Sequence, residues 1–420
     1  MEQNQISVAL VGLSLAWNFT HIFGASRCKR GLDRRKKRIL LKFAQERYGI
    51  PAERCTTAYS SVLENPKIDA IHLVTPPDTH ASFSILALES GKHCGCTIPM
   101  GMSLEDLYAV IEARQKAQRN YMFMETTVFQ REFFYLQELL AQGKLGKLQY
   151  LSCAHYQDME GWPSYWKGFP PLMHPTHALA PCLMLTGRYP AQVYGRGSGR
   201  IREELQQQYY CPFAFESAFV SLENSDLTNR NGNGFLYGVA RKLFGMLPGL
   251  RRKKSSFEWQ QLESEMPVLY SRTGALERSS TYDFDGDTER YSRGSEILEQ
   301  RVSIPDYADR LPKEIAMFTK NTVYNAKNTH LSFTQGGRAW GGPIPHLVHE
   351  FVRSIIENRK PTVDDILGAY WTGTGICAHI SAMEGGKVIE IPLNLKNINR
   401  KKLPSKLYLT VLGPCKRLSR

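Results

Sequence analysis

Two histidines three residues apart offer the clearest acid–base chemistry in this 420-residue chain. His174 and His177 belong to the segment His-Pro-Thr-His-Ala, and they would share one face of a helix if that segment is helical. Imidazole titrates near neutral pH, so such rings can exchange protons, and they can also bind a metal ion. The sequence indicates no third ligand, so we expect no metal. The remaining alternative is a pair of hydrogen-bonded core residues.

A threonine–proline turn follows an expected buried strand. The apolar run at residues 69–74 ends in Thr-Pro-Pro-Asp-Thr-His, which is residues 75–80. Paired prolines fix an extended turn, and open α/β sheets bind ligands at the carboxyl ends of their strands. Thr75, Pro76 and His80 are therefore candidates for a ligand-binding edge. The two prolines and the aspartate would also start a helix, in which case His80 is only a polar residue of its first turn.

Gly12 follows the first expected strand and precedes an expected helix. A glycine there permits a tight turn, after which the amides of the helix N-terminus can hold a pyrophosphate. Of the three glycines in the fingerprint G-x-G-x-x-G, only Gly12 is present, because Ser14 takes the second place and Trp17 the third. Ser14 could still meet a phosphate oxygen, whereas the Trp17 indole must swing aside or push the helix outward. An ordinary strand–turn–helix is the alternative.

Asp33 lies about 20 positions after Gly12, which is where an acidic residue binds the adenine ribose in dinucleotide-binding folds. Its neighbours Arg34 and Arg35 could meet a 2′-phosphate and would favour NADP over NAD. The strand that should deliver Asp33, residues 28–32, contains no β-branched run. Alternatively, Asp33 is the N-cap of the helix that runs to Tyr48.

Short apolar runs alternate with amphipathic stretches between residue 6 and about residue 125. Strands separated by helices of ten or more residues imply right-handed crossovers and a parallel sheet. We therefore predict a doubly wound α/β domain, with strands over residues 6–11, 28–32, 69–74, 93–98 and 121–124 and helices over residues 17–25, 40–48, 79–90 and 104–117.

The pattern changes after an expected helix over residues 133–142. Strand-like runs with long separations indicate a second α/β domain with an open, largely antiparallel sheet, and two late helices should pack back against that sheet or the first domain. The Asn- and Gly-rich stretch 224–254 is expected to be irregular. The predicted strands are residues 148–156, 192–195, 217–222, 257–262 and 388–391, the late helices are residues 345–357 and 363–383, and the predicted domains are residues 1–125 and 126–395 with a basic tail over 396–420.

Several segments together resemble the Gfo/Idh/MocA family, which includes glucose–fructose oxidoreductase and inositol dehydrogenase. They are the turn at residues 75–80, the run Gly-Lys-His-Cys-Gly-Cys-Thr-Ile-Pro-Met at residues 91–100, Lys-Leu-Gly-Lys at residues 144–147 and the histidine segment at residues 174–178. The resemblance covers about residues 5–200. It implies a Rossmann domain for NAD or NADP, joined to an α/β domain whose open sheet carries the substrate site and often an oligomer interface.

The resemblance also assigns cofactor-side residues. It places the Thr-Pro-x-x-x-His turn beside the cofactor, and it aligns the family's Glu-Lys-Pro with Thr97, Ile98 and Pro99. The lysine of that motif normally hydrogen-bonds the reacting hydroxyl and lowers its pKa. Ile98 can do neither, which puts the usual dehydrogenase mechanism in doubt.

The acid–base histidine of the family's Asp-x-x-x-His corresponds to His177, so the resemblance implies a proton shuttle there. Met173 holds the place of the aspartate, and His174 might substitute for it. Arg131 follows the expected strand over residues 121–124, after which this family often presents substrate-facing residues. His177 may equally be read as a hydrogen-bonded core histidine.

The run from Asp158 to Trp166 combines carboxylates with flat aromatic rings. Carboxylates accept hydroxyl hydrogen bonds and rings stack on sugar C–H surfaces, so Asp158 and Trp162 are candidate substrate residues. Loop aromatics are equally often packing groups. His346 and His349 could close the pocket, with core or capping roles as the alternative.

The net charge of +13 is concentrated in three basic blocks, residues 27–42, 251–254 and 396–420. Outside them the chain has 32 basic and 39 acidic residues, so its body is mildly acidic. The blocks carry few aromatic residues and no zinc-finger, helix-turn-helix or RRM signature, and nucleic-acid binding is therefore not expected.

Composition also bears on location and assembly. No apolar run approaches the roughly 18–20 residues of a membrane span, and the first residues lack a secretion signal. The nine cysteines are odd in number and scattered, which favours reduced thiols. We expect a cytoplasmic protein without a membrane partner, and the large second sheet favours a homo-oligomer.

These observations favour an NAD(P)-dependent oxidoreductase that moves a hydride between nicotinamide and a sugar or polyol. A catalytically degenerate relative that binds a ligand or a partner is the rival hypothesis, because Trp17, Ile98, Met173 and the weak second strand all depart from the family pattern. NAD-assisted glycoside cleavage, known in this fold, is a third hypothesis.

Overall fold

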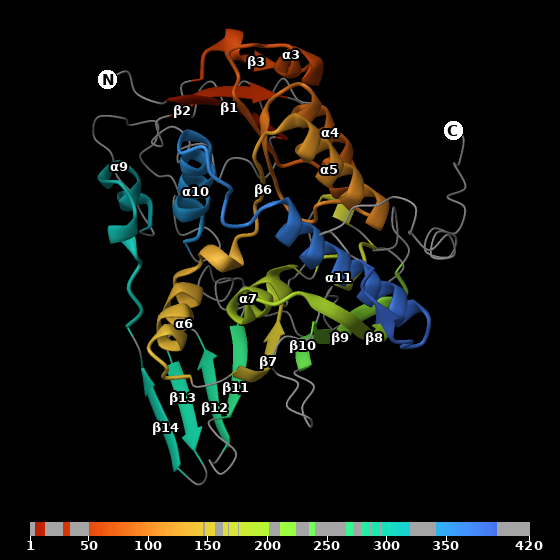
Figure 1. Cartoon of the computed structure of the whole chain (residues 1–420), viewed down its shortest axis with the longest axis vertical. Helices are drawn as coiled ribbons and strands as arrows, with labels where there is room; N and C mark the ends of the chain where they lie inside the picture. The colour runs from red at the N-terminus through yellow and green to blue at the C-terminus, as the bar shows by residue number, and fades with distance from the viewer. Residues whose placement is uncertain are drawn as a thin grey trace, which may run out of the picture.

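The computed structural model contains two β-sheets with helices packed on and between them (Figure 1). It describes residues 5–12, 28–33, 50–145, 148–155, 163–166, 168–174, 176–200, 211–223, 235–239, 266–272, 279–285, 288–293, 296–301, 303–319 and 342–392. The predicted helices over residues 17–25 and 40–48 and the predicted strand over residues 257–262 lie outside these ranges, as does the basic tail.

The first sheet is parallel and doubly wound, as predicted. Its strand order is β3-β2-β1-β4-β5-β6, so the chain proceeds outward from β1 in both directions. The β2 strand pairs with β1 along its whole length despite its poor composition, because the ladder supplies what the side chains do not. The strands are β1 (Ile6–Val11), β2 (Cys28–Asp33), β3 (Cys55–Thr56), β4 (Ala70–Leu73), β5 (His93–Cys96) and β6 (Tyr121–Phe123).

Helices α3 (Tyr59–Leu63), α4 (His80–Glu89) and α5 (Leu104–Ala117) belong to this part of the chain, with short 3-10 turns η1 (Ala52–Arg54) and η2 (Pro77–Thr79). The predicted bounds of α5 are confirmed. Its start is fixed by a capping box, in which the Ser103 hydroxyl accepts from the Asp106 amide at 3.2 Å and the Asp106 carboxylate accepts from the Ser103 amide at 3.1 Å.

The second sheet has nine strands in the order β14-β13-β12-β11-β7-β10-β9-β8-β15. Every recorded pair is antiparallel except β7 with β10, so the predicted open and largely antiparallel sheet is confirmed. The strands are β7 (Leu148–Ala154), β8 (Pro190–Arg200), β9 (Phe213–Leu222), β10 (Phe235–Val239), β11 (Met266–Arg272), β12 (Ser279–Asp285), β13 (Thr288–Arg293), β14 (Glu296–Arg301) and β15 (Ile389–Glu390).

One expectation for this sheet was wrong. The stretch 224–254 was expected to be irregular, yet β10 lies within it, between β7 and β9. Strands β11 to β14 were also not predicted. Segments such as Thr-Glu-Arg-Tyr-Ser-Arg in β13 carry no apolar run, and their pairing with neighbouring strands, rather than their own composition, holds them extended.

The remaining helices follow the first sheet in the chain. Among the helices of the described ranges, none has both the length and the apolar character needed to cross a bilayer. They are α6 (Arg131–Ala141), α7 (Thr176–Thr186), α9 (Lys313–Ala316), α10 (Ile344–Ile356) and α11 (Asp365–Met383), with 3-10 turns η3 (Thr127–Phe129), η4 (Ser164–Trp166), η5 (Pro171–Met173), η7 (Ala308–Arg310) and η8 (Met317–Thr319).

Helix α11 contacts both sheets, between which it lies in Figure 1. Toward the first sheet, the Thr372 hydroxyl accepts from the Met100 amide at 3.2 Å. Toward the second, the Ser381 hydroxyl accepts from the Gly195 amide at 2.8 Å, and a Cβ on Gly195 would lie only 2.2 Å from the Ala378 carbonyl oxygen. The prediction that the late helices pack back against the rest of the chain is therefore confirmed.

Candidate functional site

Gly12 follows β1 at the carboxyl edge of the parallel sheet, in a conformation that requires glycine. Its φ is +96°, and an added Cβ would lie 2.1 Å from the Val74 carbonyl oxygen. The Val74 amide also donates to the Val11 carbonyl at 2.7 Å. The turn after β1 therefore packs with bare backbone against the residue that precedes Thr75. A side chain would fill this space, so the arrangement fits a turn that must approach a dinucleotide closely.

His80 ties two neighbouring turns of this edge together. Its Nδ1 lies 2.6 Å from the Pro99 carbonyl oxygen and its Nε2 lies 2.7 Å from the Thr75 carbonyl oxygen, and the residue is 1% exposed. Burial alone would lower the pKa of His80, but Cys96 and the two carbonyls raise it overall. Both carbonyls can only accept, so the paired hydrogen bonds require a proton on each ring nitrogen. The buried His80 ring therefore holds the Thr75 and Pro99 backbones in place.

The turn after β5 carries an apolar side chain at Ile98. The Thr97 hydroxyl donates to the Leu73 carbonyl at 3.0 Å, and the Ile98 side chain is buried at 8% exposure. The Ile98–Pro99 peptide is cis. Ile98 therefore brings no ammonium group to this edge.

A buried carboxylate, Glu125, stands just after β6 at the same edge. Its Oε1 lies 2.6 Å from the His177 Nδ1 and also accepts from the Thr127 amide at 3.0 Å and the Thr127 hydroxyl at 2.9 Å. Burial alone would raise the pKa of Glu125, but the His177 charge and these hydrogen bonds lower it to about 2. Glu125 is therefore ionised at neutral pH and fixes the orientation of the imidazole.

His177 is the second residue of α7. Although α7 lies after the first sheet in the sequence, the His177 side chain contacts Glu125 at the edge of that sheet. Its side chain keeps 16% exposure, whereas that of Glu125 has none. The hydrogen bond to Glu125 is made through Nδ1, and it fixes the plane of an imidazole that can exchange protons near neutral pH.

Two more histidines surround His177. The ring of His155, which follows β7, lies 5.0 Å from the His177 ring between centroids, and the His174 ring lies 5.1 Å away. Both are nearly buried, and His174 packs edge-on against Trp166 at 5.0 Å. The described residues bring one trio of ligand-type atoms within 4.8 Å of one another, and these histidines are not that trio. We therefore interpret them as a packed group around an acid–base residue.

The other predicted site residues lie in different places. Arg131 begins α6, where its guanidinium contacts the Glu132 carboxylate at 2.8 Å and the Ile304 carbonyl at 3.4 Å. Asp33 is the last residue of β2, paired with Val11 at the carboxyl edge. Ser14, Trp17, Arg34, Arg35, Asp158 and Trp162 lie outside the described residues.

The late-helix histidine His346 has a core role rather than a pocket-closing one. It is 7% exposed, its ring packs edge-on against Phe134 at 5.0 Å between centroids, and its Nε2 lies 3.3 Å from the Asp306 carbonyl oxygen. Burial lowers its pKa to about 4, so the ring is neutral at physiological pH.

Sequence reasoning missed Glu125 and His155. Each is the first ionisable residue after a buried strand, β6 and β7 respectively. That position is a usable signal, because strand ends are where open sheets present functional side chains. Neither residue belongs to a motif that would have marked it.

Part of the chain resembles a known protein family. Residues 24–125 match the family described as "Oxidoreductase family, NAD-binding Rossmann fold" (GFO_IDH_MocA). A glycosyl hydrolase family 109 protein of Shewanella baltica is 28% identical over 139 residues, which is 30% of this chain and 30% of that protein. The chain therefore matches less than a third of the length of this relative.

Two solved structures share the fold over nearly the whole chain. Aldose-aldose oxidoreductase from Caulobacter crescentus has a TM-score of 0.65 at 17% identity, covering 92% of this chain and 100% of that one. Levoglucosan dehydrogenase, in complex with NADH and levoglucosan, has a TM-score of 0.66 at 15% identity, covering 93% and 100%. At such identity the likeness concerns the fold alone. Residues 24–125 are thus similar to the NAD-binding Rossmann domain of the Gfo/Idh/MocA oxidoreductases, and the chain as a whole shares the fold of these two solved oxidoreductases.

Proposed function

We propose that the protein is an NAD-dependent oxidoreductase that transfers a hydride between a nicotinamide coenzyme and a carbon of a sugar or polyol. The observation that carries the proposal is the 2.6 Å hydrogen bond between Glu125 and His177. It holds an acid–base group from the second part of the chain at the carboxyl edge of the parallel sheet, where this fold binds its ligands.

The coenzyme would lie along that edge, on residues 1–125. Gly12 and Ser14 would face the diphosphate, Asp33 the adenine ribose, and the Thr75–Pro76 turn, Thr97 and Pro99 the nicotinamide side, supported from beneath by His80. Arg34 and Arg35 would favour NADP if they reach a 2′-phosphate. When bound, the nicotinamide takes up the hydride that leaves a carbinol carbon, or returns it to a carbonyl carbon.

His177 would move the proton that accompanies the hydride. With Nδ1 donating to the Glu125 carboxylate, a neutral ring presents an unprotonated Nε2 to the substrate hydroxyl. Nε2 takes the hydroxyl proton as the carbon becomes a carbonyl, and the ionised Glu125 stabilises the imidazolium that forms. Because Ile98 supplies no ammonium group, the dyad of Glu125 and His177 would carry this step unaided by lysine.

The substrate would bind on residues 126–395. His174 would contact it beside His177, and Arg131, Asp158 and Trp162 are the further candidates. A carboxylate and an indole suit a carbohydrate, because hydroxyl groups donate to the first and C–H surfaces stack on the second.

The principal alternative is redox-neutral cleavage of a glycosidic bond with a retained coenzyme. It is favoured by the similarity to a glycosyl hydrolase family 109 protein and by the absence of the lysine at Ile98. The two reactions differ in their products. A dehydrogenase converts sugar and NAD stoichiometrically, so reduced coenzyme accumulates. A glycosidase of this kind releases the aglycone of a chromogenic glycoside with no net change in the coenzyme.

Turnover of the His177→Ala variant tests the proposed role of the dyad. On whichever sugar, polyol or glycoside proves active in a panel, we expect turnover to fall by roughly 10²–10⁴, the usual cost of losing acid–base catalysis, with coenzyme affinity nearly unchanged. Lys116→Ala, which changes an exposed side chain on α5 away from the proposed site, is the control and should retain activity. Unchanged turnover in His177→Ala would remove His177 from the mechanism.

A further inference from the structure

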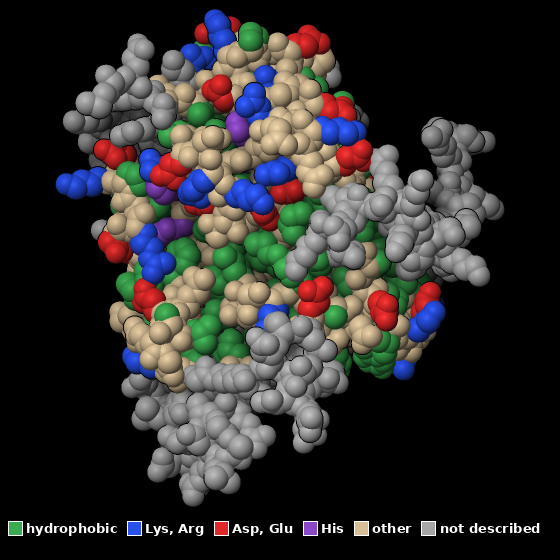
Figure 2. All heavy atoms as spheres, viewed as in Figure 1, with side chains coloured by type: hydrophobic (Ala, Val, Ile, Leu, Met, Phe, Trp, Pro, Cys, Tyr) green, Lys and Arg blue, Asp and Glu red, His purple; other side chains and the backbone are tan. Residues whose placement is uncertain are grey.

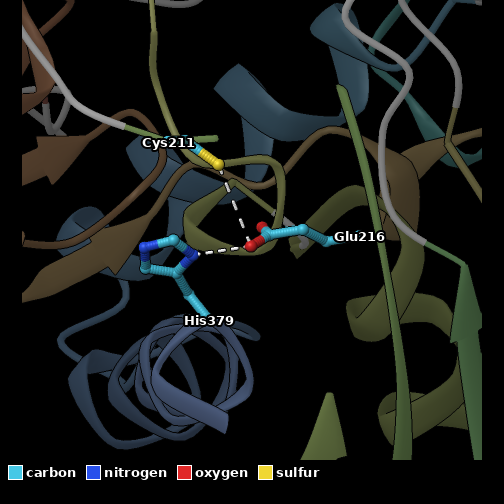
Figure 3. Close-up of side chains that lie close together, drawn as sticks. All are labelled: Cys211, Glu216 and His379. Carbon is cyan, nitrogen blue, oxygen red and sulfur yellow. Dashed lines mark hydrogen bonds and ion pairs between the residues drawn. The ribbon is translucent and has the colours of Figure 1, made fainter. Parts of the chain in front are cut away.

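A second group of chemically capable side chains lies within the second sheet and its covering helix (Figure 3). It consists of Cys211, Glu216 on β9 and His379 on α11, and its three ligand-type atoms lie within 4.8 Å of one another. Cys211 and Glu216 are fully buried and His379 is 4% exposed. The group plays no part in the proposed hydride transfer.

The three donors are a thiol sulfur, a carboxylate oxygen and an imidazole nitrogen. This mixed set is typical of sites for zinc, a borderline-soft ion that favours tetrahedral coordination by nitrogen, oxygen and sulfur. We propose that Cys211, Glu216 and His379 bind a divalent zinc-like cation, with a water molecule at the fourth position. The inference goes beyond the proposed function and does not depend on it.

The observed distances are close to those of a tetrahedral site. Bond lengths of about 2.0–2.3 Å require a sulfur–oxygen edge of about 3.6 Å and a nitrogen–oxygen edge of about 3.4 Å. The Cys211 Sγ lies 4.0 Å from the Glu216 Oε1, and the His379 Nδ1 lies 2.7 Å from the same oxygen. These two edges must change by less than about 1 Å, and the third, between the Cys211 sulfur and a His379 ring nitrogen, is no longer than 4.8 Å. The hydrogen bond between Glu216 and His379 would be exchanged for two metal–ligand bonds.

The surroundings support Glu216 as a monodentate ligand. Its second oxygen, Oε2, accepts from the Leu172 amide at 2.7 Å, so the carboxylate is held with Oε1 facing the other two donors. Ligating carboxylates in metal sites are fixed in this way by an outer hydrogen bond. A thiolate and a carboxylate together also neutralise a divalent ion, so the filled site would bury no net charge.

Binding would release the Cys211 thiol proton. In the metal-free protein the Cys211 sulfur lies 3.6 Å from the Phe213 carbonyl oxygen. The thiol proton must leave as the sulfur–metal bond forms, and the His379 proton must move from Nδ1 to Nε2. Affinity should therefore increase with pH.

A bound cation would also stabilise the segment that carries two histidines of the proposed active site. Leu172 lies in η5, two residues before His174 and five before His177. A cation on Glu216 would fix the carboxylate that holds the Leu172 amide, and with it the start of the segment that carries both histidines.

Cobalt titration tests the proposal. Untagged full-length protein, stripped with chelator and kept anaerobic, would be titrated with Co²⁺ and then with Zn²⁺. We expect one equivalent of Co²⁺, a thiolate-to-cobalt charge-transfer band, and loss of that band as Zn²⁺ displaces it. Cys211→Ser should abolish the band and weaken affinity by at least the roughly 10–100-fold that loss of an outer partner already costs. Cys377→Ser changes a different buried thiol, on α11, and should keep both the charge-transfer band and the affinity.

Three outcomes would overturn the proposal. Wild-type protein without a stoichiometric charge-transfer band would show that the trio is only a hydrogen-bonded core network. A band that persists in Cys211→Ser would place the metal elsewhere. If Cys211→Ser does not fold, His379→Gln replaces it, and an undiminished affinity in that variant is equally decisive. Coenzyme-dependent turnover, measured in parallel on the stripped protein, keeps this result separate from the proposed function.

Discussion

Glu125 and His177 connect the two parts of the chain at the level of single atoms. An ionised carboxylate with no exposed surface is stable only because three donors converge on one of its oxygens, and one of them is the imidazole. The hydrogen bond between Glu125 and His177 therefore also stabilises the fold. Its contribution to the free energy of unfolding can be measured without a substrate.

Acid unfolding should reveal this contact. The pKa of Glu125 is lowered from 4.5 to about 2, so its stabilising contribution is fully present above pH 4.5 and is lost as the pH falls toward about 2. At most it amounts to about 3 kcal/mol. Denaturant unfolding across this pH range should show a steep loss of stability in the wild type and a shallower loss in Glu125→Gln. The turnover of Glu125→Gln should also be at least tenfold lower than that of the wild type. Parallel acid profiles would contradict the ionised pair.

The elements of the first sheet were largely predictable, and the reasons are local. The amphipathic pattern over residues 104–117 predicted α5, and the glycine after a first apolar run located the turn at Gly12. Glu125 was missed although it follows a strand, because that position is its only signal and it belongs to no motif with a spacing to recognise. The β10 strand was missed because its extended state depends on β7 and β9, which lie far away in sequence.

Replacing each of two glycines by alanine distinguishes the cost of a steric clash from the cost of backbone strain. Gly12 and Gly91 both have positive φ, +96° and +78°, but a Cβ on Gly91 would meet nothing within 4 Å. Gly91→Ala should therefore cost only the left-handed strain of about 1–2 kcal/mol. Gly12→Ala must also displace the Val74 carbonyl, so we expect a larger loss of stability in thermal unfolding and weaker coenzyme binding. Equal losses in the two variants would contradict the close packing at Val74.

Helix α11 makes the two sheets one structural unit at the scale of the whole molecule, since it hydrogen-bonds to backbone amides beside both. Acidic and basic side chains are interspersed over the described part of the face in Figure 2, without a large field of one sign. The three basic blocks contribute no described side chains, and self-association through the second sheet stays a prediction.

The contact of α11 with the first sheet can be tested by a threonine pair. Thr372→Val leaves the buried Met100 amide without its acceptor, which should cost about 1–3 kcal/mol. Thr374 is also buried on α11, but Thr374→Val removes only a hydrogen bond to the Tyr370 carbonyl within the helix. This variant should therefore lose less stability than Thr372→Val. Chemical denaturation of both variants measures the difference, and a Thr374→Val loss as large as that of Thr372→Val would argue against the bridging role.

Calorimetric titration of the purified protein with NAD⁺, NADH, NADP⁺ and NADPH is the most direct test of the central claim, that the edge at Gly12 and Thr75 holds a nicotinamide coenzyme beside the Glu125–His177 pair. We predict that at least one of the four binds with a dissociation constant below the millimolar range, that Gly12→Ala weakens it, and that His177→Ala leaves it nearly unchanged. Failure of all four to bind at millimolar concentration would contradict the claim.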